Sequence, residues 1–530
     1  MTGIDRRQLL GRTAAAATLG AFAPSLAPSS LWAQEKGGTT RITHAISAGD
    51  ISSLDPTLAW VSAEVPIVTV VMEGLVSYPP GTVSTDFVPA LAESWKISDD
   101  GKVYTFALRK GVQWHGGFGE FTSDDVKFSL DRYMDPKVSP WSANYNNVSS
   151  VEVLDPHSVR ITLKAPDPFF LSTVASDTES VGLMVSKKAF ETRGAAAMRF
   201  SPIGTGPFQF KDYTPKDKVV MTRNDAYWGG KPHVDEIVIR FMPSSAAREL
   251  AMRTGEIDSM RAALDAQLLD RLAKQGYVID NKGPEINWWL HINTRMKPLD
   301  DIRVRQAIAH AINTADLKAL LGPVATIPTQ LVGPAYFGAA SPGDFSDAQK
   351  WTYDPEKSKK LLADAGHGSG IKLDMIISER DDYRQMMVLM QDQLQKVGVN
   401  VTLNSVDHAY YHSQIVKFVN PLVLFGDITY PNAEILLSRA FRTGAMRNFS
   451  GWHDPSFDAL LDKVSGAQDL EARRKLLVEA QQRVADQFVL VPAIFTGQPL
   501  VRSKRVDLGY QLKSSLALEY RYSQLTRISG

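Results

Sequence analysis

Short strand-like runs alternate with helical patterns along the whole chain, and this alternation predicts α/β architecture. The clearest stretch begins with a helix expected over Asp354–Ala365, which an Asp-Pro pair opens and a glycine closes. An alternating strand at Ile371–Ile377, a helix at Tyr383–Val397 and a second strand at Val399–Val406 follow. A strand–helix–strand passage of this kind predicts two parallel neighbouring strands.

A second helical pattern covers Asp300–Leu321. Apolar residues recur there at helical spacing, from Val304 to Ile312, and Gly322-Pro323 ends the pattern. We therefore expect one helix over this stretch. The chain has 530 residues, more than one hydrophobic core usually supports, so two or more domains are expected.

The first 33 residues have the composition of an export signal. Residues Met1–Ala33 combine a short charged start, an apolar stretch at Ala14–Leu26 and a small-residue exit. Arg6-Arg7, followed one residue later by Leu9-Leu10, is similar to a twin-arginine signal. A disordered alanine-rich tail is the alternative. The pattern predicts that residues 1–33 are a twin-arginine-like signal peptide removed on export.

Cysteine count and charge narrow the compartment and the partners. The chain contains no cysteine, which excludes disulfides, thiol catalysis and a lipidated cysteine. No later stretch is apolar enough to span a membrane. We therefore expect a soluble protein of the periplasm, without a lipid anchor. Lysine plus arginine and aspartate plus glutamate both number 58, so no basic footprint for nucleic acid is present.

Motifs for catalysis are missing. The chain has no G-x-S-x-G, no phosphate-binding G-x-x-x-x-G-K-[ST] and no H-E-x-x-H. His408 and His412 have the spacing of one helical face, but no third metal ligand is near them in the sequence. We expect no enzyme activity, no metal and no cofactor.

Several segments, taken in their order and spacing, are specific for one family. The mature chain, from about Ile42 to Arg527, resembles the family 5 solute-binding proteins of ABC importers, which include dipeptide-, oligopeptide- and nickel-binding proteins. The segments that carry the resemblance are Leu54-Asp55-Pro56, Glu73-Gly74-Leu75-Val76, Val88–Trp95, Asp99–Phe106, Leu108–Val112, Phe121–Val126, Gly204–Phe208, Asn224–Trp228 and Asp301–Ile308.

The resemblance implies a two-lobed periplasmic binding protein fold of type II, similar to the large proteins of cluster C. Its ligand cleft would lie between two lobes joined by a strand hinge. Lobe I would be discontinuous, comprising residues 34–284 with an extra subdomain and residues 499–530, and lobe II would comprise residues 285–498. The two crossings would fall near Asn287–Asn293 and Pro492–Gln498.

The same resemblance implies a role in transport. A monomer would capture a peptide or peptide-like solute, close around it and deliver it to the permease subunits in the inner membrane. A non-peptide solute, such as an opine, an oligosaccharide or a metal chelate, is the first alternative. An exported hydrolase and an adaptor for a chemoreceptor are more remote alternatives.

Asp427 is the main candidate ligand residue. It ends an apolar strand-like run, and in peptide-binding relatives the matching aspartate takes the ligand's α-ammonium. The alternative is an aspartate that caps the helix beginning near Asn432. Peptide binders commonly have tryptophan three residues before this aspartate, where this chain has Leu424, and this departure keeps the non-peptide alternative open.

Arg380 is the candidate for a ligand carboxylate, since its planar fork binds carboxylates through two hydrogen bonds. The alternative is a surface arginine paired with Glu379, Asp381 or Asp382. Aromatic side chains are expected to line the cleft, and strand alternation allows only one of two adjacent tryptophans to face a ligand. The aromatic candidates are Trp60, Trp141, Tyr145, Trp288, Trp289, Tyr410, Tyr411 and Phe425.

Overall fold

The computed structural model describes residues 39–59, 63–82, 86–175, 181–280, 286–334, 336–427, 432–445, 447–513 and 520–529. Residues Thr39–Gly530 form one compact unit. The proposed signal peptide, residues 1–33, lies outside the described residues. No helix within the described ranges is long and apolar enough to cross a membrane.

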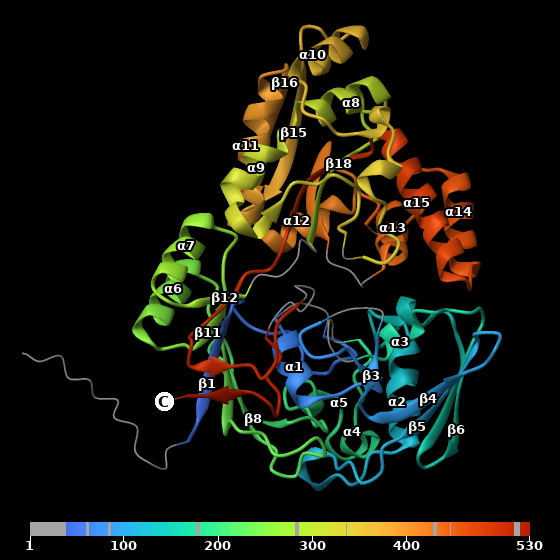
Figure 1. Cartoon of the computed structure of the whole chain (residues 1–530), viewed down its shortest axis with the longest axis vertical. Helices are drawn as coiled ribbons and strands as arrows, with labels where there is room; N and C mark the ends of the chain where they lie inside the picture. Colours follow the sequence, from blue (N-terminus) through green and yellow to red (C-terminus); the bar gives the residue numbers. More distant parts are fainter. Residues whose placement is uncertain are drawn as a thin grey trace, which may run out of the picture. The chain divides into compact units, whose positions relative to one another are not determined.

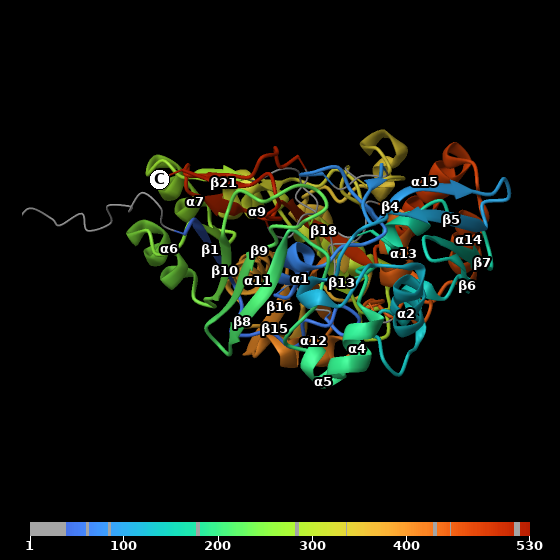
Figure 2. The ribbon, with the colours of Figure 1, turned by 90° about the horizontal axis from the view of Figure 1, so that it is seen from below.

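A seven-stranded mixed sheet collects strands from both ends of the chain. Its order is β12-β19-β11-β1-β10-β9-β8, and Figure 2 shows β1, β10, β9 and β8 as neighbours. The central β1 is parallel to β10 and β11, and the other pairs are antiparallel. The strands are β1 (Arg41–Ile46), β8 (Phe208–Thr214), β9 (Lys218–Arg223), β10 (Glu236–Phe241), β11 (Ser259–Arg261), β12 (Val278–Asp280) and β19 (Leu500–Arg502).

A four-stranded antiparallel sheet contains the two strands, β13 and β18, at which the crossings are predicted. Its order is β14 (Ala325–Thr326), β18 (Leu490–Thr496), β13 (Ile286–Ile292) and β17 (Leu422–Asp427). The chain enters residues 286–498 through β13 and leaves them through β18, and these two strands are hydrogen-bonded neighbours. The division into two lobes at these strands stays a prediction.

The parallel pair predicted between residues 371 and 406 is confirmed. β15 (Ile371–Ser378) pairs in parallel with β16 (Val399–Val406), and α11 (Asp381–Gln395) connects them. Every second residue of β15 is buried, from Ile371 to Ile377, because α11 and the apolar core cover one face of the pair. Figure 1 shows α11 along β15 and β16.

The single helix expected over Asp300–Leu321 is wrong. The structure has two helices, α8 (Ile302–Ala311) and α9 (Thr314–Leu321). The break lies at Asn313, whose backbone is extended and whose side-chain oxygen accepts a hydrogen bond from Ala315 N at 3.1 Å. Asparagine caps a new helix well, and here this local bond replaces continuation of the first one.

The remaining elements complete the layers. A third sheet has the order β4-β5-β7-β6. Its strands are β4 (Ala92–Ile97), β5 (Val103–Leu108), β6 (Val148–Asp155) and β7 (Ser158–Leu163), and two small pairs are β2 (Val76–Ser77) with β3 (Val88–Pro89) and β20 (Val506–Asp507) with β21 (Arg527–Ile528). The other helices are α1 (Val65–Val71), α2 (Ser123–Met134), α3 (Phe170–Thr173), α4 (Lys187–Arg193), α5 (Ala195–Met198), α6 (Ser245–Thr254), α7 (Ala266–Lys274), α10 (Pro355–Asp364), α12 (His408–Ile415), α13 (Ala433–Phe441), α14 (Pro455–Gly466) and α15 (Leu470–Gln487).

Candidate functional site

Asp427 lies at the end of β17, where an apolar strand leaves the core. β17 runs antiparallel to β13, and Asp427 stands opposite Asn287. The residues Leu422–Phe425 are buried, and only 2% of the Asp427 side chain is exposed. Asp427 does not cap the following helix, because the Asn432 side chain does so by accepting a hydrogen bond from Glu434 N. The strand therefore holds a nearly buried carboxylate that does not cap α13.

A cation compensates this carboxylate. Arg447 Nη1 donates a hydrogen bond to Asp427 Oδ1 at 2.6 Å, and the guanidinium carbon lies 5.5 Å from the centre of the Phe425 ring. The Arg447 side chain is 30% exposed. A buried charge needs such a partner. Nothing in the local sequence predicts that Arg447 contacts Asp427, because it lies 20 residues later in the chain, after α13.

Two histidines of α12 lie next to Phe425. His412 and Phe425 have ring centres 5.6 Å apart, and His412 and His408 have ring centres 4.4 Å apart, as successive turns of α12 bring them together. Burial, with the Arg380 charge next in size, lowers the pKa of His408 to about 4. Burial and the charges of Arg380 and Arg447 also lower the pKa of His412. Low pKa values favour the neutral form of both rings.

Arg380 meets this group from the start of α11. Its Nη1 lies 3.3 Å from His408 Nε2, and its Nε donates to Asp382 Oδ1 at 3.1 Å. The arginine is therefore paired with Asp382, as the surface alternative expected, and 48% of its side chain is exposed. The two charged residues predicted from the sequence nevertheless belong to one cluster. We call it the Asp427 cluster: Arg380, Asp382, Tyr383, His408, His412, Phe425, Asp427 and Arg447.

Of the other predicted aromatic residues, Tyr411 borders the cluster, with its ring centre 5.7 Å from that of Tyr383 and 5.8 Å from that of His412. Trp60 is outside the described residues. Tyr410 is exposed on α12. Trp141 is half-buried and its Nε1 donates to a main-chain carbonyl, and Tyr145 is buried with its hydroxyl on another. Tyr411 is buried, and its hydroxyl donates to a carbonyl of β17 at 2.9 Å. The ligand contacts assigned to these residues stay predictions.

Trp288 and Trp289 point to opposite sides of β13. Trp289 belongs to one apolar core, whereas Trp288 belongs to another and packs edge-on against Tyr383 of the Asp427 cluster at 5.1 Å. Both are buried, with Nε1 of each donating to a protein oxygen. The alternation expected from a strand is confirmed. Trp288 packs against the cluster through Tyr383.

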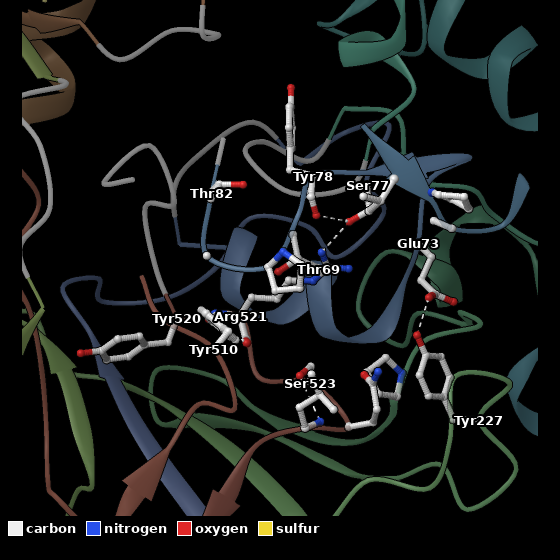
Figure 3. A pocket seen from close by; sticks show the side chains of 18 of the residues that line it. Thr69, Glu73, Ser77, Tyr78, Thr82, Tyr227, Tyr510, Tyr520, Arg521 and Ser523 are labelled. Atoms are coloured by element: carbon white, nitrogen blue, oxygen red, sulfur yellow. Dashed lines mark hydrogen bonds between the residues drawn. The ribbon is translucent and has the colours of Figure 1, made fainter. Parts of the chain in front are cut away.

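A separate polar network lines a cavity of about 200 Å³ beside α1 and the C-terminal segment (Figure 3). The Glu73 carboxylate is buried there and accepts hydrogen bonds from Thr205 Oγ1 at 2.8 Å, Tyr227 Oη at 2.7 Å and Trp228 Nε1 at 2.9 Å. Burial raises the pKa of Glu73, and the three donors oppose that shift. Three donors satisfy both carboxylate oxygens, so this network stabilises the fold around the cavity.

Arg521 also borders this cavity. Its Nη1 donates a hydrogen bond to Ser77 Oγ at 3.0 Å (Figure 3). Burial lowers the pKa of Arg521, and the negative charge of Glu73 opposes that shift. The sequence marks Glu73 within a family segment but gives no sign that distant donors converge on it.

The described residues offer no metal site. No group of three or more histidine or acidic side chains within the described ranges is arranged to hold a metal ion. His408 and His412 are adjacent, but His408 Nδ1 is hydrogen-bonded to Ser378 Oγ at 2.8 Å and its Nε2 faces Arg380. A cation so close to His408 disfavours a metal at this pair.

Comparison with known proteins identifies the family. Residues 86–446 match the model of bacterial extracellular solute-binding proteins, family 5, middle region, which is more than half of the chain. The chain belongs to this family. The dipeptide-binding protein of Escherichia coli K12 is 31% identical over 444 residues, which are 78% of this chain and 81% of that protein.

Solved structures agree with this assignment. The binding protein MoaA of A. tumefaciens R10, in complex with mannopinic acid, has a TM-score of 0.84 and 32% identity, covering 93% of this chain and all of that one. The periplasmic binding protein DppA of Helicobacter pylori, in complex with the peptide STSA, has a TM-score of 0.78 and 26% identity, covering 92% and 98%. This solute-binding protein therefore has the predicted α/β periplasmic binding protein fold. It is the substrate-binding component of an ABC importer and not an enzyme.

Proposed function

We propose that this solute-binding protein captures a peptide or peptide-like solute at the Asp427 cluster and delivers it to an ABC permease. The observation that carries the proposal is the near-buried Asp427 carboxylate, which shares one cluster with Arg380 and with aromatic rings. A site of this kind offers charge partners for ligand termini and apolar surface for the remainder. The relative named for dipeptides and the structure that holds the peptide STSA support the same ligand class.

The finer features of this role belong to the same proposal. The protein would work as a monomer in the periplasm, and it would carry no lipid on a cysteine because the chain has none. Ligand would favour a closed form of the two lobes through its higher affinity for that form. β13 and β18 would serve as the hinge, since both connect the predicted lobes and are neighbours in one sheet.

A ligand screen tests the proposal. Protein would be purified from the periplasm of the organism that produces it and stripped of bound solute by unfolding and refolding. It would then be screened by thermal shift against di-, tri- and tetrapeptides and against opines. A solute at 100 times its dissociation constant should add about 2.7 kcal/mol to the free energy of unfolding.

Variants locate the binding site in the same screen. Asp427→Asn should abolish the shift, whereas Asp374→Asn, which changes an exposed aspartate on β15, should leave it unchanged. The proposal is overturned if no peptide or peptide-like solute shifts the protein, if Asp427→Asn retains the full shift, or if the purified protein hydrolyses peptides.

A further inference from the structure

The pairing of Asp427 with Arg447 bears on which ligand end can bind. A site for an ordinary peptide amino terminus needs a carboxylate whose charge is available to an ammonium group. Here Asp427 Oδ1 already accepts a hydrogen bond from Arg447 Nη1 at 2.6 Å. The charges of this pair sum to zero. An incoming ammonium group alone would have to compete with a guanidinium that is held beside the Phe425 ring.

The rest of the cluster does not alter this balance. Arg380 is paired with Asp382, and these charges also cancel. His408 and His412 have lowered pKa values, so they add little positive charge at neutral pH. A cluster without net charge, which holds a carboxylate and a guanidinium side by side, complements a ligand group that carries both charges.

The pair also has free hydrogen-bonding groups for both charges of such a ligand, an acceptor on Asp427 and donors on Arg447. Within the part of the chain that the structure describes, Arg447 is the only hydrogen-bond partner of the Asp427 side chain, and it uses one oxygen. Asp427 Oδ2 can therefore accept a bond from an ammonium group. Arg447 uses one of five N–H donors on Asp427, and a guanidinium offers its other donors to a carboxylate as a fork. The Arg447 side chain is 30% exposed, which makes it the more accessible member of the pair.

We infer that Asp427 and Arg447 together bind a zwitterionic α-amino-acid group, with the ligand ammonium on Asp427 and the carboxylate of the same carbon on Arg447. This inference rests on the proposed function and narrows it. The α-carbon at the amino end of an ordinary peptide carries a neutral amide, which can accept a hydrogen bond from Arg447 but cannot form an ion pair with it. The solute class is therefore a peptide-like compound joined through a side chain, such as a γ-glutamyl compound, whose α-amino-acid group is free.

Two isomers provide the sharpest probe. γ-Glutamylalanine and α-glutamylalanine have the same atoms and net charge, but only the γ isomer carries its ammonium and a carboxylate on one carbon at the amino end. Isothermal titration calorimetry of the stripped full-length mature protein should give a dissociation constant at least tenfold lower for the γ isomer. Equal affinities, or tighter binding of the α isomer, would overturn the inference.

Variants of Arg447 separate recognition from folding. Arg447→Gln should weaken γ-glutamylalanine at least tenfold and leave α-glutamylalanine equally or more tightly bound. Arg447→Lys keeps the charge but not the fork, so its γ-isomer affinity should fall between those of wild type and Arg447→Gln. Arg442→Gln is the control, because Arg442 pairs with Asp462 and neither residue is a member of the cluster. An equal loss for both isomers in Arg447→Gln would show that Arg447 only supports the fold, and would overturn the inference.

The outcomes also separate this inference from the proposed function. If ordinary α-linked peptides bind and γ-linked compounds do not, the inference fails and the proposed function stands. If neither α-linked nor side-chain-linked compounds bind, both fail.

Discussion

His291 makes the stability of this solute-binding protein depend on pH in a way that can be measured. It lies on β13 with 2% of its surface exposed, and its Nδ1 has no hydrogen-bond partner in the described parts of the chain. Its neighbours are aromatic, with the Phe449 ring 5.3 Å away and the Trp289 ring 5.8 Å away. Burial lowers the pKa of His291 to about 3.

The direction of the effect follows from this lowered pKa. The unfolded chain takes up a proton at His291 near pH 6.5, whereas the folded protein resists it down to about pH 3. The stability that depends on a neutral His291 is therefore complete above pH 6.5 and falls as the pH decreases below that value. Proton linkage gives a loss of about 2 kcal/mol between pH 7.5 and pH 5.0.

His291→Leu removes this linkage. Urea unfolding of wild type and variant, followed by circular dichroism at pH 7.5 and pH 5.0, should show the difference between their free energies of unfolding shifting by about 2 kcal/mol in favour of the variant at the lower pH. His233→Leu changes an exposed histidine, and we expect it to alter stability by less than about 0.5 kcal/mol. If the difference between wild type and His291→Leu is the same at both pH values, His291 is not kept neutral by burial and the reasoning is refuted.

Four further substitutions test the core and the support of the site. Arg473→Met leaves the buried Glu434 carboxylate without its ion-pair partner and should cost about 3–5 kcal/mol in urea unfolding, whereas Arg473→Met combined with Glu434→Leu should recover most of that loss. Gly426→Ala brings a methyl group to 2.9 Å from the Trp288 ring, so calorimetry should show at least tenfold weaker ligand binding next to Asp427, and unchanged affinity would contradict this. Gly204→Ala would place its methyl group 1.8 Å from a main-chain oxygen and should cost about 3 kcal/mol, which a near-wild-type urea midpoint would disprove.

Local patterns predicted the fold where short-range chemistry decides it. The β15–α11–β16 passage was predictable, because apolar alternation and the glycines before each strand, Gly370 and Gly398, act within a few residues. The break between α8 and α9 was missed, although Asn313 stands where a cap can form. Apolar spacing alone does not show whether such a side chain points to its own backbone, so periodicity overestimated the length of the helix.

The site was predictable only in part, for a related reason. Asp427 stands out in the sequence because a carboxylate ends an apolar run. Arg447 does not stand out, since the contact depends on how the chain returns after α13. The Glu73 network is similar, with donors more than 130 residues away in the sequence. Family resemblance marks such residues as important but does not state which atoms they contact.

The neighbouring positions of β13 and β18 make residues 286–496 an insertion in topological terms. Ile286 and Thr496 stand opposite each other, and a few residues outside them Asp280 and Leu500 are paired in the seven-stranded sheet. The first and last residues of the segment are therefore neighbours in the fold. Domains with adjacent ends are the ones that insertion tolerates. Exchange of this segment between relatives would carry the whole Asp427 cluster into a new protein as one piece, while the strand order of the host sheet stayed the same.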